Sequence, residues 1–138
     1  MSQELRQLFD SLIEESPFIQ SCGMEVVDLN VEAGSVDMKM PLLPNLARDK
    51  AATQFHGGAI ASLIDTAGDL AVALSVGGAV PTINFRVDFI RPSGGPYLIA
   101  KAVARRVGRS VGVADVDVYD EQGRLTAIGR GCYSAQKG

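Results

Sequence analysis

A long apolar segment near the middle of the chain has a helical pattern of hydrophobic positions. The segment QFHGGAIASLIDTAGDLAVALSV spans residues 54–76, and the pair Gly57-Gly58 opens its apolar run. At about 100° per residue, one arc roughly 120° wide collects the larger apolar side chains: Ile60, Leu63, Ile64, Ala67, Leu70, Ala71 and Leu74. The pattern predicts one long helix that faces the core with this arc and ends at Gly77-Gly78.

The opposite side of this helix has two aspartates one turn apart, Asp65 and Asp69. Their neighbours on that side are small or apolar: Ala61, Gly68, Val72 and Val76. A solvated face usually has lysines and glutamates, whereas a helix that is apolar all round is normally buried. We therefore expect something else to cover this side, most simply a second subunit. Two solvated aspartates on an exposed face are the alternative.

Alternation of apolar and polar residues predicts strands on both sides of the helix. Val36, Met38 and Met40, for example, alternate with Asp37 and Lys39. We expect six strands, over residues 23–32, 35–40, 82–91, 97–107, 110–119 and 124–134. In the first strand, Val27, Leu29 and Val31 should share a face. A change of phase in the fifth strand points to a bulge near Gly112.

The order of these elements predicts an α+β fold. Short loops between strands favour antiparallel neighbours, and the single long helix is the obvious cover for one face of the sheet. We expect one domain over residues 1–138, with a sheet of about six strands wrapped around the central helix. A shorter amphipathic helix should precede it over residues 3–15 and stop at Pro17.

Composition and charge exclude several classes of function. The chain has 138 residues and a net charge of −3, and no basic stripe indicates nucleic acid as a partner. Without a basic start followed by an apolar run, no secretory signal is visible, and we expect a cytoplasmic protein. Cys22 and Cys132 lack metal-ligand spacing, so we expect free thiols rather than a disulfide. One histidine and no cysteine cluster leave too few ligands for a metal. Asp65 and Asp69, and the lack of flanking positive charge, argue against a membrane span.

The start of the long helix is the strongest candidate for chemistry. The first N–H groups of a helix have no partners within the helix, and its dipole makes that end positive. Gly57 and Gly58 could therefore direct N–H groups at a carbonyl oxygen that gains negative charge during acyl transfer. His56, the only histidine, is either a general base or a structural residue. No serine or cysteine at suggestive spacing offers it a nucleophile, which favours the structural role.

Asp65 lies eight residues beyond Gly57, about 12 Å along a helix. One small carbonyl cannot touch both residues in the same chain. Two copies of the helix packed side by side and antiparallel would bring Gly57 of one to Asp65 of the other. This arrangement would also cover the side of the helix that holds the aspartates. The sequence therefore favours a site built across a dimer interface.

These residues resemble a known family. The segment HGGAIASLID, the later strand ending in FIRP and the strands after it are similar to hotdog-fold acyl-CoA thioesterases. The similarity is to the phenylacetate-pathway and 4-hydroxybenzoyl-CoA thioesterase type, from about residue 23 to residue 133. The resemblance implies a dimer, usually a dimer of dimers, that hydrolyses an acyl-CoA without metal or cofactor. It also implies that the Gly57 N–H polarises the thioester carbonyl and that Asp65 is the nucleophile or general base.

The resemblance also suggests substrate-binding positions. Relatives often have Asn or Gln six residues before the histidine, where this chain has Lys50, and Gln54 or Asn45 could replace that amide. They often have Thr or Ser one turn after the acidic residue, where this chain has Asp69. Thr82 resembles a position that is often a site hydroxyl. Three arginines fall where loops would contact CoA phosphates, although solvated surface arginines are the alternative: Arg91, Arg106 and Arg109. The small residues beside Asp65 would allow aromatic or medium-chain acyl groups.

Two other functions are possible in the same fold. A hydratase or dehydratase would pair a histidine with a carboxylate inside the site, whereas His56 precedes the helix. A non-catalytic module would bind acyl-CoA as a sensor and would usually have an added DNA-binding segment. Release of free thiol from a panel of acyl-CoAs would separate a thioesterase from both.

Overall fold

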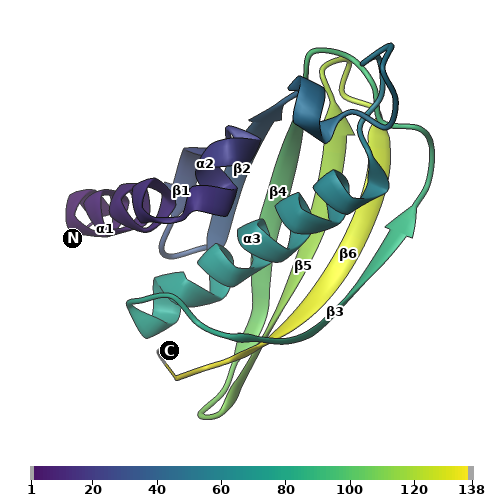
Figure 1. Cartoon of the computed structure of the whole chain (residues 1–138). Helices are drawn as coiled ribbons and strands as arrows, with labels where there is room; N and C mark the ends of the chain where they lie inside the picture. Colours follow the sequence, from purple (N-terminus) through teal and green to yellow (C-terminus); the bar gives the residue numbers. More distant parts are fainter. Residues whose placement is uncertain (1, 137–138) are drawn as a thin grey trace.

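The computed structural model describes residues 2–136, beginning with two helices and ending with four consecutive strands (Figure 1). The helices α1 (Ser2–Glu15) and α2 (Pro17–Cys22) precede the hairpin of β1 (Glu25–Asn30) and β2 (Ser35–Pro41). A 3₁₀ turn, η1 (Pro44–Leu46), leads to the long helix α3 (Gly57–Val76). The remaining strands are β3 (Thr82–Phe89), β4 (Tyr97–Val107), β5 (Val111–Asp120) and β6 (Leu125–Ser134).

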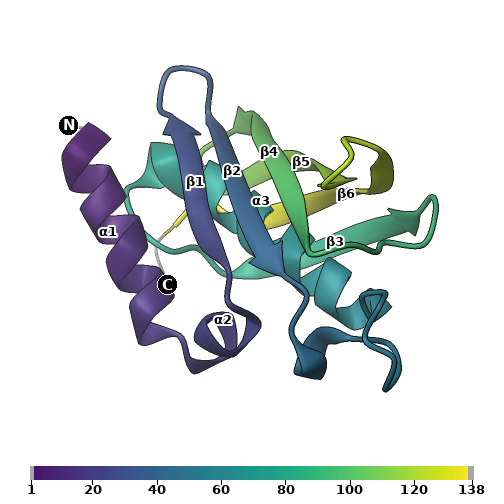
Figure 2. The ribbon, with the colours of Figure 1, turned by 90° about the horizontal axis from the view of Figure 1, so that it is seen from above.

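The strands form one antiparallel sheet in the order β1-β2-β4-β5-β6-β3. The helix α3 runs across one face of this sheet and contacts five of its strands, all except β1. Figures 1 and 2 show the sheet passing around the helix. The predicted α+β architecture, a six-stranded sheet around one central helix, is confirmed.

The limits and the core face of α3 agree with the sequence prediction. All the residues of the predicted arc are buried, and Gly77 ends the helix with a φ of 86°. Burial of each large aliphatic side chain contributes about 1.5–3 kcal/mol, so this arc fixes the helix on the sheet. The helix is long and apolar enough to cross a membrane, but most of it is buried inside this chain as the core helix.

The sheet covers more of α3 than the helical wheel indicated. Gly68 and Val72, expected on the uncovered side, are both buried within the chain. A Cβ on Gly68 would overlap the Tyr133 hydroxyl, and Val72 packs against Gly112 of β5. These two positions therefore cannot border an acyl group as expected. The side left partly open holds Ala61, Asp65, Asp69 and Val76, all half-buried.

Two strand predictions were wrong, one because a bulge changes the phase of β1 and one because β5 keeps a single phase, with Gly112, Ala114 and Val116 all buried. In β1 the pairing with β2 shifts between Val26 and Asp28, so Val26 is buried and Val27 is 43% exposed. The bulge expected near Gly112 lies instead in the neighbouring strand β4. There the register shifts between Ala104 and Arg106, opposite Val113 and Ala114.

The N-terminal segment contains one more helix than expected. Pro17 does not only end α1; it also occupies the first turn of α2. Ser16 caps α2, because its Oγ accepts a hydrogen bond from the Ile19 N–H at 3.2 Å. Proline is well suited to a first helical position, since its missing N–H has no partner there in any case. The short helix α2 lies close to the region where α3 begins (Figure 2).

The two edges of the sheet differ. At the β1 edge, α1 packs alongside, and Arg6 Nη2 donates a hydrogen bond to the Val26 carbonyl at 2.6 Å. The β3 edge pairs only with β6 and has exposed apolar side chains, including Ile83 and Phe89, each 56% exposed. An exposed apolar edge strand is a ready surface for pairing with another chain.

Candidate active site

His56 is the N-cap of α3. Its backbone is extended, and its Nδ1 accepts a hydrogen bond from the Gly58 N–H at 2.8 Å. Because Nδ1 is the acceptor, the neutral ring has its proton on Nε2. This contact supports the structural role that the sequence favoured for His56. It also occupies the Gly58 N–H, which is therefore not available to a bound carbonyl in this arrangement.

The Gly57 N–H differs from that of Gly58. Among residues 2–136, no acceptor bonds to the Gly57 N–H. Neither the backbone nor packing requires glycine here, since a Cβ would meet only the Phe89 ring at 3.4 Å, an ordinary contact. At position 58 a Cβ would approach His56 Nδ1 to 3.1 Å. The absent side chain at Gly57 thus leaves an unpaired donor accessible at the positive end of α3.

Asp65 is held by contacts to both its side chain and its main chain. Thr82, the first residue of β3, donates from Oγ1 to Asp65 Oδ1 at 2.8 Å. The Tyr133 hydroxyl, from β6, donates to the Asp65 carbonyl oxygen at 3.1 Å. Burial raises the pKa of Tyr133, so it remains a donor. The structure therefore joins Thr82 to Asp65, two of the predicted site residues that are 17 positions apart.

Asp69 lies one turn further along α3 in a more apolar setting. The pKa of Asp69 is raised to about 7, mainly by burial and also by the nearby Asp65 carboxylate. A backbone hydrogen bond from the Val80 N–H at 3.4 Å acts in the opposite direction and lowers it. Near neutral pH, Asp69 thus alternates between a protonated and an ionised form.

An arginine-lined hollow borders the start of α3 on the side of β3. Its volume is about 360 Å³, and it is lined in part by Arg48, Gln54, Gly57, Phe89 and Arg91. A second hollow of about 550 Å³ shares Gln54 and Arg91 and adds Arg124. We call these two spaces together the arginine hollow. Gln54 and Arg91, two of the candidate binding residues, therefore lie beside Gly57. Arg48, whose Nη1 donates to Gln54 Oε1 at 3.0 Å, was missed because only the loop brings it there.

Other predicted binding residues are not brought to the arginine hollow. Lys50 is exposed in the loop before α3 and does not line it. Asn45 lies in η1, where its Nδ2 donates to the Ser21 carbonyl at 3.1 Å. Arg106 and Arg109 lie at the hairpin between β4 and β5, at the end of the molecule away from Gly57 (Figure 1). Of the three arginines proposed for phosphate, only Arg91 is next to Gly57 within one chain.

A smaller hollow lies on the other side of the helix start, between α2 and α3. It has a volume of about 200 Å³ and is lined by Phe18, Cys22, Asn45, Leu46, His56, Gly58, Ala59 and Ser62. We call it the α2 hollow. Sequence spacing did not indicate that Cys22 and Ser62 would line the same hollow as His56. Burial raises the pKa of the Cys22 thiol, and Ser62 Oγ donates to the Gly58 carbonyl at 2.8 Å, so neither is an activated nucleophile.

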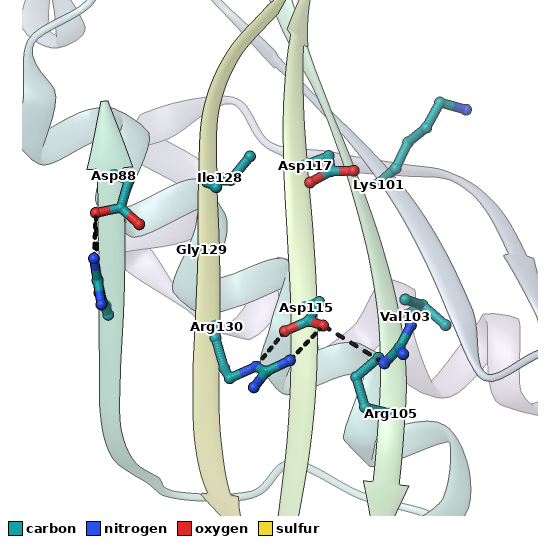
Figure 3. Close-up of a pocket in the computed structure, with 10 residues that line it drawn as sticks. Asp88, Lys101, Val103, Arg105, Asp115, Asp117, Ile128, Gly129 and Arg130 are labelled. Atoms are coloured by element: carbon teal, nitrogen blue, oxygen red, sulfur yellow. Dashed lines mark hydrogen bonds and ion pairs between the residues drawn. The ribbon is translucent and has the colours of Figure 1, made fainter. Parts of the chain in front are cut away.

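A third hollow lies on the outer face of the sheet, away from α3 (Figure 3). Several of its charged side chains are paired. Arg130 contacts Asp115 through two hydrogen bonds of 2.6 and 2.9 Å, and Arg105 Nε lies 3.5 Å from the same carboxylate. The hydrogen bonds from Arg130 lower the pKa of Asp115. A carboxylate with a lowered pKa and arginine partners is a poor nucleophile or base, which makes Asp115 a weak catalytic candidate.

The sheet wrapped around one central helix defines a hotdog-fold protein, with an unpaired N–H at the helix start and a carboxylate held by Thr82. Residues 54–127 match the family model of the thioesterase superfamily. Over 137 residues the chain is 34% identical to a putative esterase of Halobacterium salinarum, an alignment that covers 91% of this chain and 89% of that protein. The chain belongs to the thioesterase superfamily, and the resemblance found in the sequence is confirmed.

Two further relatives carry more specific names. The medium/long-chain acyl-CoA thioesterase YigI of Escherichia coli K12 is 28% identical over 138 residues, which covers 87% of this chain and 86% of that protein. The solved structure of the E. coli PaaI protein from the phenylacetic acid degradation operon superposes with a TM-score of 0.85. It is 25% identical and covers 99% of this chain and 96% of that one. These comparisons indicate that this chain is a thioester hydrolase.

Proposed function

We propose that this chain hydrolyses acyl-CoA thioesters at a site shared by the α3 helices of two subunits. One observation carries the proposal. The unpaired Gly57 N–H and the Thr82-held Asp65 carboxylate both border the open part of α3, yet they lie about 12 Å apart along one helix. A second, antiparallel α3 would bring the Gly57 of one subunit to the Asp65 of the other. The names of YigI and PaaI support acyl-CoA as the substrate class.

The open edge of β3 supports this dimer. Ile83, Phe85 and Phe89 are 40–56% exposed there, and a two-fold axis would pair the edge with its own copy. The same axis would cover the half-buried Asp65 and Asp69. Because the β1 edge is already occupied by α1, the β3 edge is the one available for continuing the sheet.

The reaction follows from the two groups at the shared site. The thioester carbonyl oxygen accepts a hydrogen bond from the Gly57 N–H, which stabilises the negative charge of the tetrahedral state. Asp65 of the other subunit either attacks the carbonyl carbon directly or removes a proton from an attacking water. The carbon–sulfur bond then breaks and CoA leaves as the thiolate, which takes up a proton. In the direct route, water hydrolyses the resulting anhydride and releases the acid.

The arginine hollow is the proposed path for CoA. The nucleotide has several phosphates, and arginine binds phosphate well through paired N–H groups. Arg91 is exposed and borders both parts of the hollow. Arg106 and Arg109 would reach a phosphate only from another subunit. Charge reversal at Arg91 should raise KM for acyl-CoA and leave short pantetheine thioesters little changed. Equal effects on both substrates would contradict this path.

A dimer of dimers, which the resemblance implies, would need a further surface. The outer face of the sheet offers alternating charges on Arg86, Asp88, Lys101, Asp115 and Asp117, which a two-fold related copy could match. Reversal of a charge there should lower the mass in solution from four chains to two. Retention of four chains would point to another surface.

The hydratase alternative is less well supported, because His56 Nδ1 is occupied by the Gly58 N–H. A panel of acyl-CoAs with a thiol reagent tests all three functions. A thioesterase releases free CoA, a hydratase changes the absorbance of an enoyl thioester without releasing thiol, and a sensor does neither. Light scattering on the same sample tests the dimer. A folded, active monomer would overturn the shared site while leaving thioester hydrolysis in place.

A further inference from the structure

The start of α3 separates two hollows of opposite character. The arginine hollow has Arg48, Arg91 and Arg124 among its lining residues. The α2 hollow has no arginine, lysine, aspartate or glutamate among its lining residues. Gly57 borders the first and Gly58 borders the second, and consecutive Cα atoms are only about 3.8 Å apart. A carbonyl bound at the Gly57 N–H therefore has a basic space on one side and an uncharged space on the other.

We propose that the α2 hollow binds the acyl group of the substrate and that Phe18 limits the length of the acyl chain that fits. The inference rests on the proposed thioesterase function and adds the substrate class, which is compact acyl groups with an aromatic ring or a chain of about six carbons. It assigns the phosphates of CoA to one side of the helix start and the acyl group to the other.

Several polar groups around the α2 hollow are already paired, which suits an apolar occupant, while the exposed His56 ring keeps its Nε2–H for solvent. Ser62 Oγ donates to the Gly58 carbonyl at 2.8 Å, and Asn45 Nδ2 donates to the Ser21 carbonyl at 3.1 Å. The Gly58 N–H donates to His56 Nδ1. Placing an apolar group against these atoms removes water from them without breaking a hydrogen bond. Burial of an unpaired donor, by contrast, would cost about 1–3 kcal/mol.

The size of the hollow sets the acyl length. The α2 hollow has a volume of about 200 Å³, against about 360 and 550 Å³ for the two parts of the arginine hollow, and this small size suits a compact acyl group. Cys22 and Leu46 close the hollow on the inside, since they are 1% and 6% exposed. Phe18 is 56% exposed and borders the hollow from α2. A large exposed aromatic ring beside a cavity is a common feature of ligand sites.

The test measures kcat/KM with a series of saturated acyl-CoAs from two to twelve carbons and with phenylacetyl-CoA. The natural chain should prefer substrates of about six carbons or the aromatic acyl group. In Phe18→Ala the optimum should move to longer chains, and the ratio of decanoyl to hexanoyl kcat/KM should rise about tenfold. In Ser62→Leu, which fills the hollow, hexanoyl-CoA should lose about tenfold while acetyl-CoA is little changed.

Val27→Ala is the matched control. It shortens another exposed apolar side chain, 43% exposed in β1, and should leave the chain-length profile unchanged. Circular dichroism checks the fold of Ser62→Leu, and Phe18→Ala provides the test if that variant does not fold. Unchanged profiles in an active Phe18→Ala would overturn this inference alone. If the natural chain releases no CoA from any substrate, the proposed function itself fails.

Discussion

One side of α3 is fully covered within a single chain, and the other side is left partly open. The core side is finished within one chain, since Leu63, Ile64 and Ala67 are all 0% exposed. The other side holds Asp65 and Asp69, which are half-buried. At the N-terminal start of the same helix, the Gly57 N–H is unpaired. The same helix thus provides fold stability on one side and the proposed reactive groups on the other. Substitutions on the two sides should therefore have separable effects on unfolding and on catalysis.

Asp65→Asn tests the reactive side most strongly. The amide keeps the shape of the carboxylate and can still accept from Thr82, but it cannot serve as nucleophile or base. We expect kcat to fall by roughly two to four orders of magnitude with little change in KM. Steady-state thiol release measures this. Near-normal kcat in Asp65→Asn, together with an inactive Asp69→Asn, would transfer the role to Asp69.

Leu63→Ala tests the core side. The side chain is fully buried, so its loss should lower the free energy of unfolding by about 2–5 kcal/mol. The rate per folded molecule should stay within a few-fold of the natural chain. Urea titration at fixed protein concentration measures the free energy of unfolding. Thiol release under conditions in which the variant is folded measures the rate per folded molecule. The exposed Ser75→Ala on the same helix is the control. A loss of kcat as large as that of Asp65→Asn would show that the two sides are coupled.

Asp69→Asn tests the pH dependence of the reactive side. Because the pKa of Asp69 is raised from 3.8 to about 7, the folded state binds more protons than the unfolded state between these values. Stability should therefore fall as the pH rises from about 4 to about 7, by at most roughly 4 kcal/mol. The asparagine variant should lack this decrease, which urea midpoints at pH 5 and pH 8 would reveal. We also expect it to shift the acid limb of the pH–rate profile. Identical pH profiles for both chains would contradict the assignment.

A pair of glycine substitutions sharpens the comparison. Gly57→Ala should leave stability unchanged or slightly higher, because the new Cβ meets only the Phe89 ring at 3.4 Å. It should lower kcat/KM about tenfold or more by blocking the approach to the N–H. Gly68→Ala should do the reverse and cost about 1–3 kcal/mol of stability, because its Cβ would overlap the Tyr133 hydroxyl. Calorimetry measures the stability of both variants, and thiol release measures their kcat/KM.

Thr82→Val should have the smallest effect. It removes the 2.8 Å hydrogen bond to Asp65 and keeps the shape of the side chain. Hydrogen bonds to charged groups contribute about 1.5–3 kcal/mol, and partial exposure reduces this, so we expect kcat to fall about tenfold or less. Thr82→Ser, which keeps the hydroxyl, should retain most of the natural kcat. A valine variant as active as the natural chain would show that Asp65 is positioned without Thr82.

Features that follow from a repeated hydrophobic pattern were predicted correctly from the sequence. Features that depend on a single residue were not. The limits and core arc of α3 followed from its helical period, which no bulge interrupts. The buried face of β1 did not, because one extra residue at Val27 reverses the alternation without a sequence signal. Pro17 was misinterpreted for a different reason, since proline suits both the end of one helix and the first turn of the next.

At the candidate site, local chemistry was predictable and long-range assembly was not. The donor at Gly57 follows from its position at a helix start. The resemblance gave Thr82 as a site hydroxyl but not its contact with Asp65, because spacing along the chain cannot indicate which strand begins beside a helix turn. Arg48, Phe18 and Cys22 were missed because loops and the short helix α2 bring them to the start of α3.

The separation of Gly57 and Asp65 along one helix has a genetic consequence. If each site takes Gly57 from one subunit and Asp65 from the other, two inactive variants can restore activity when they are mixed. A dimer that joins a Gly57→Ala chain to an Asp65→Asn chain contains one site with both defects and one site with neither. Random pairing in equal amounts places half of the dimers in this mixed class, so roughly a quarter of all sites are intact. Two defective alleles expressed together would then give thioesterase activity that neither gives alone.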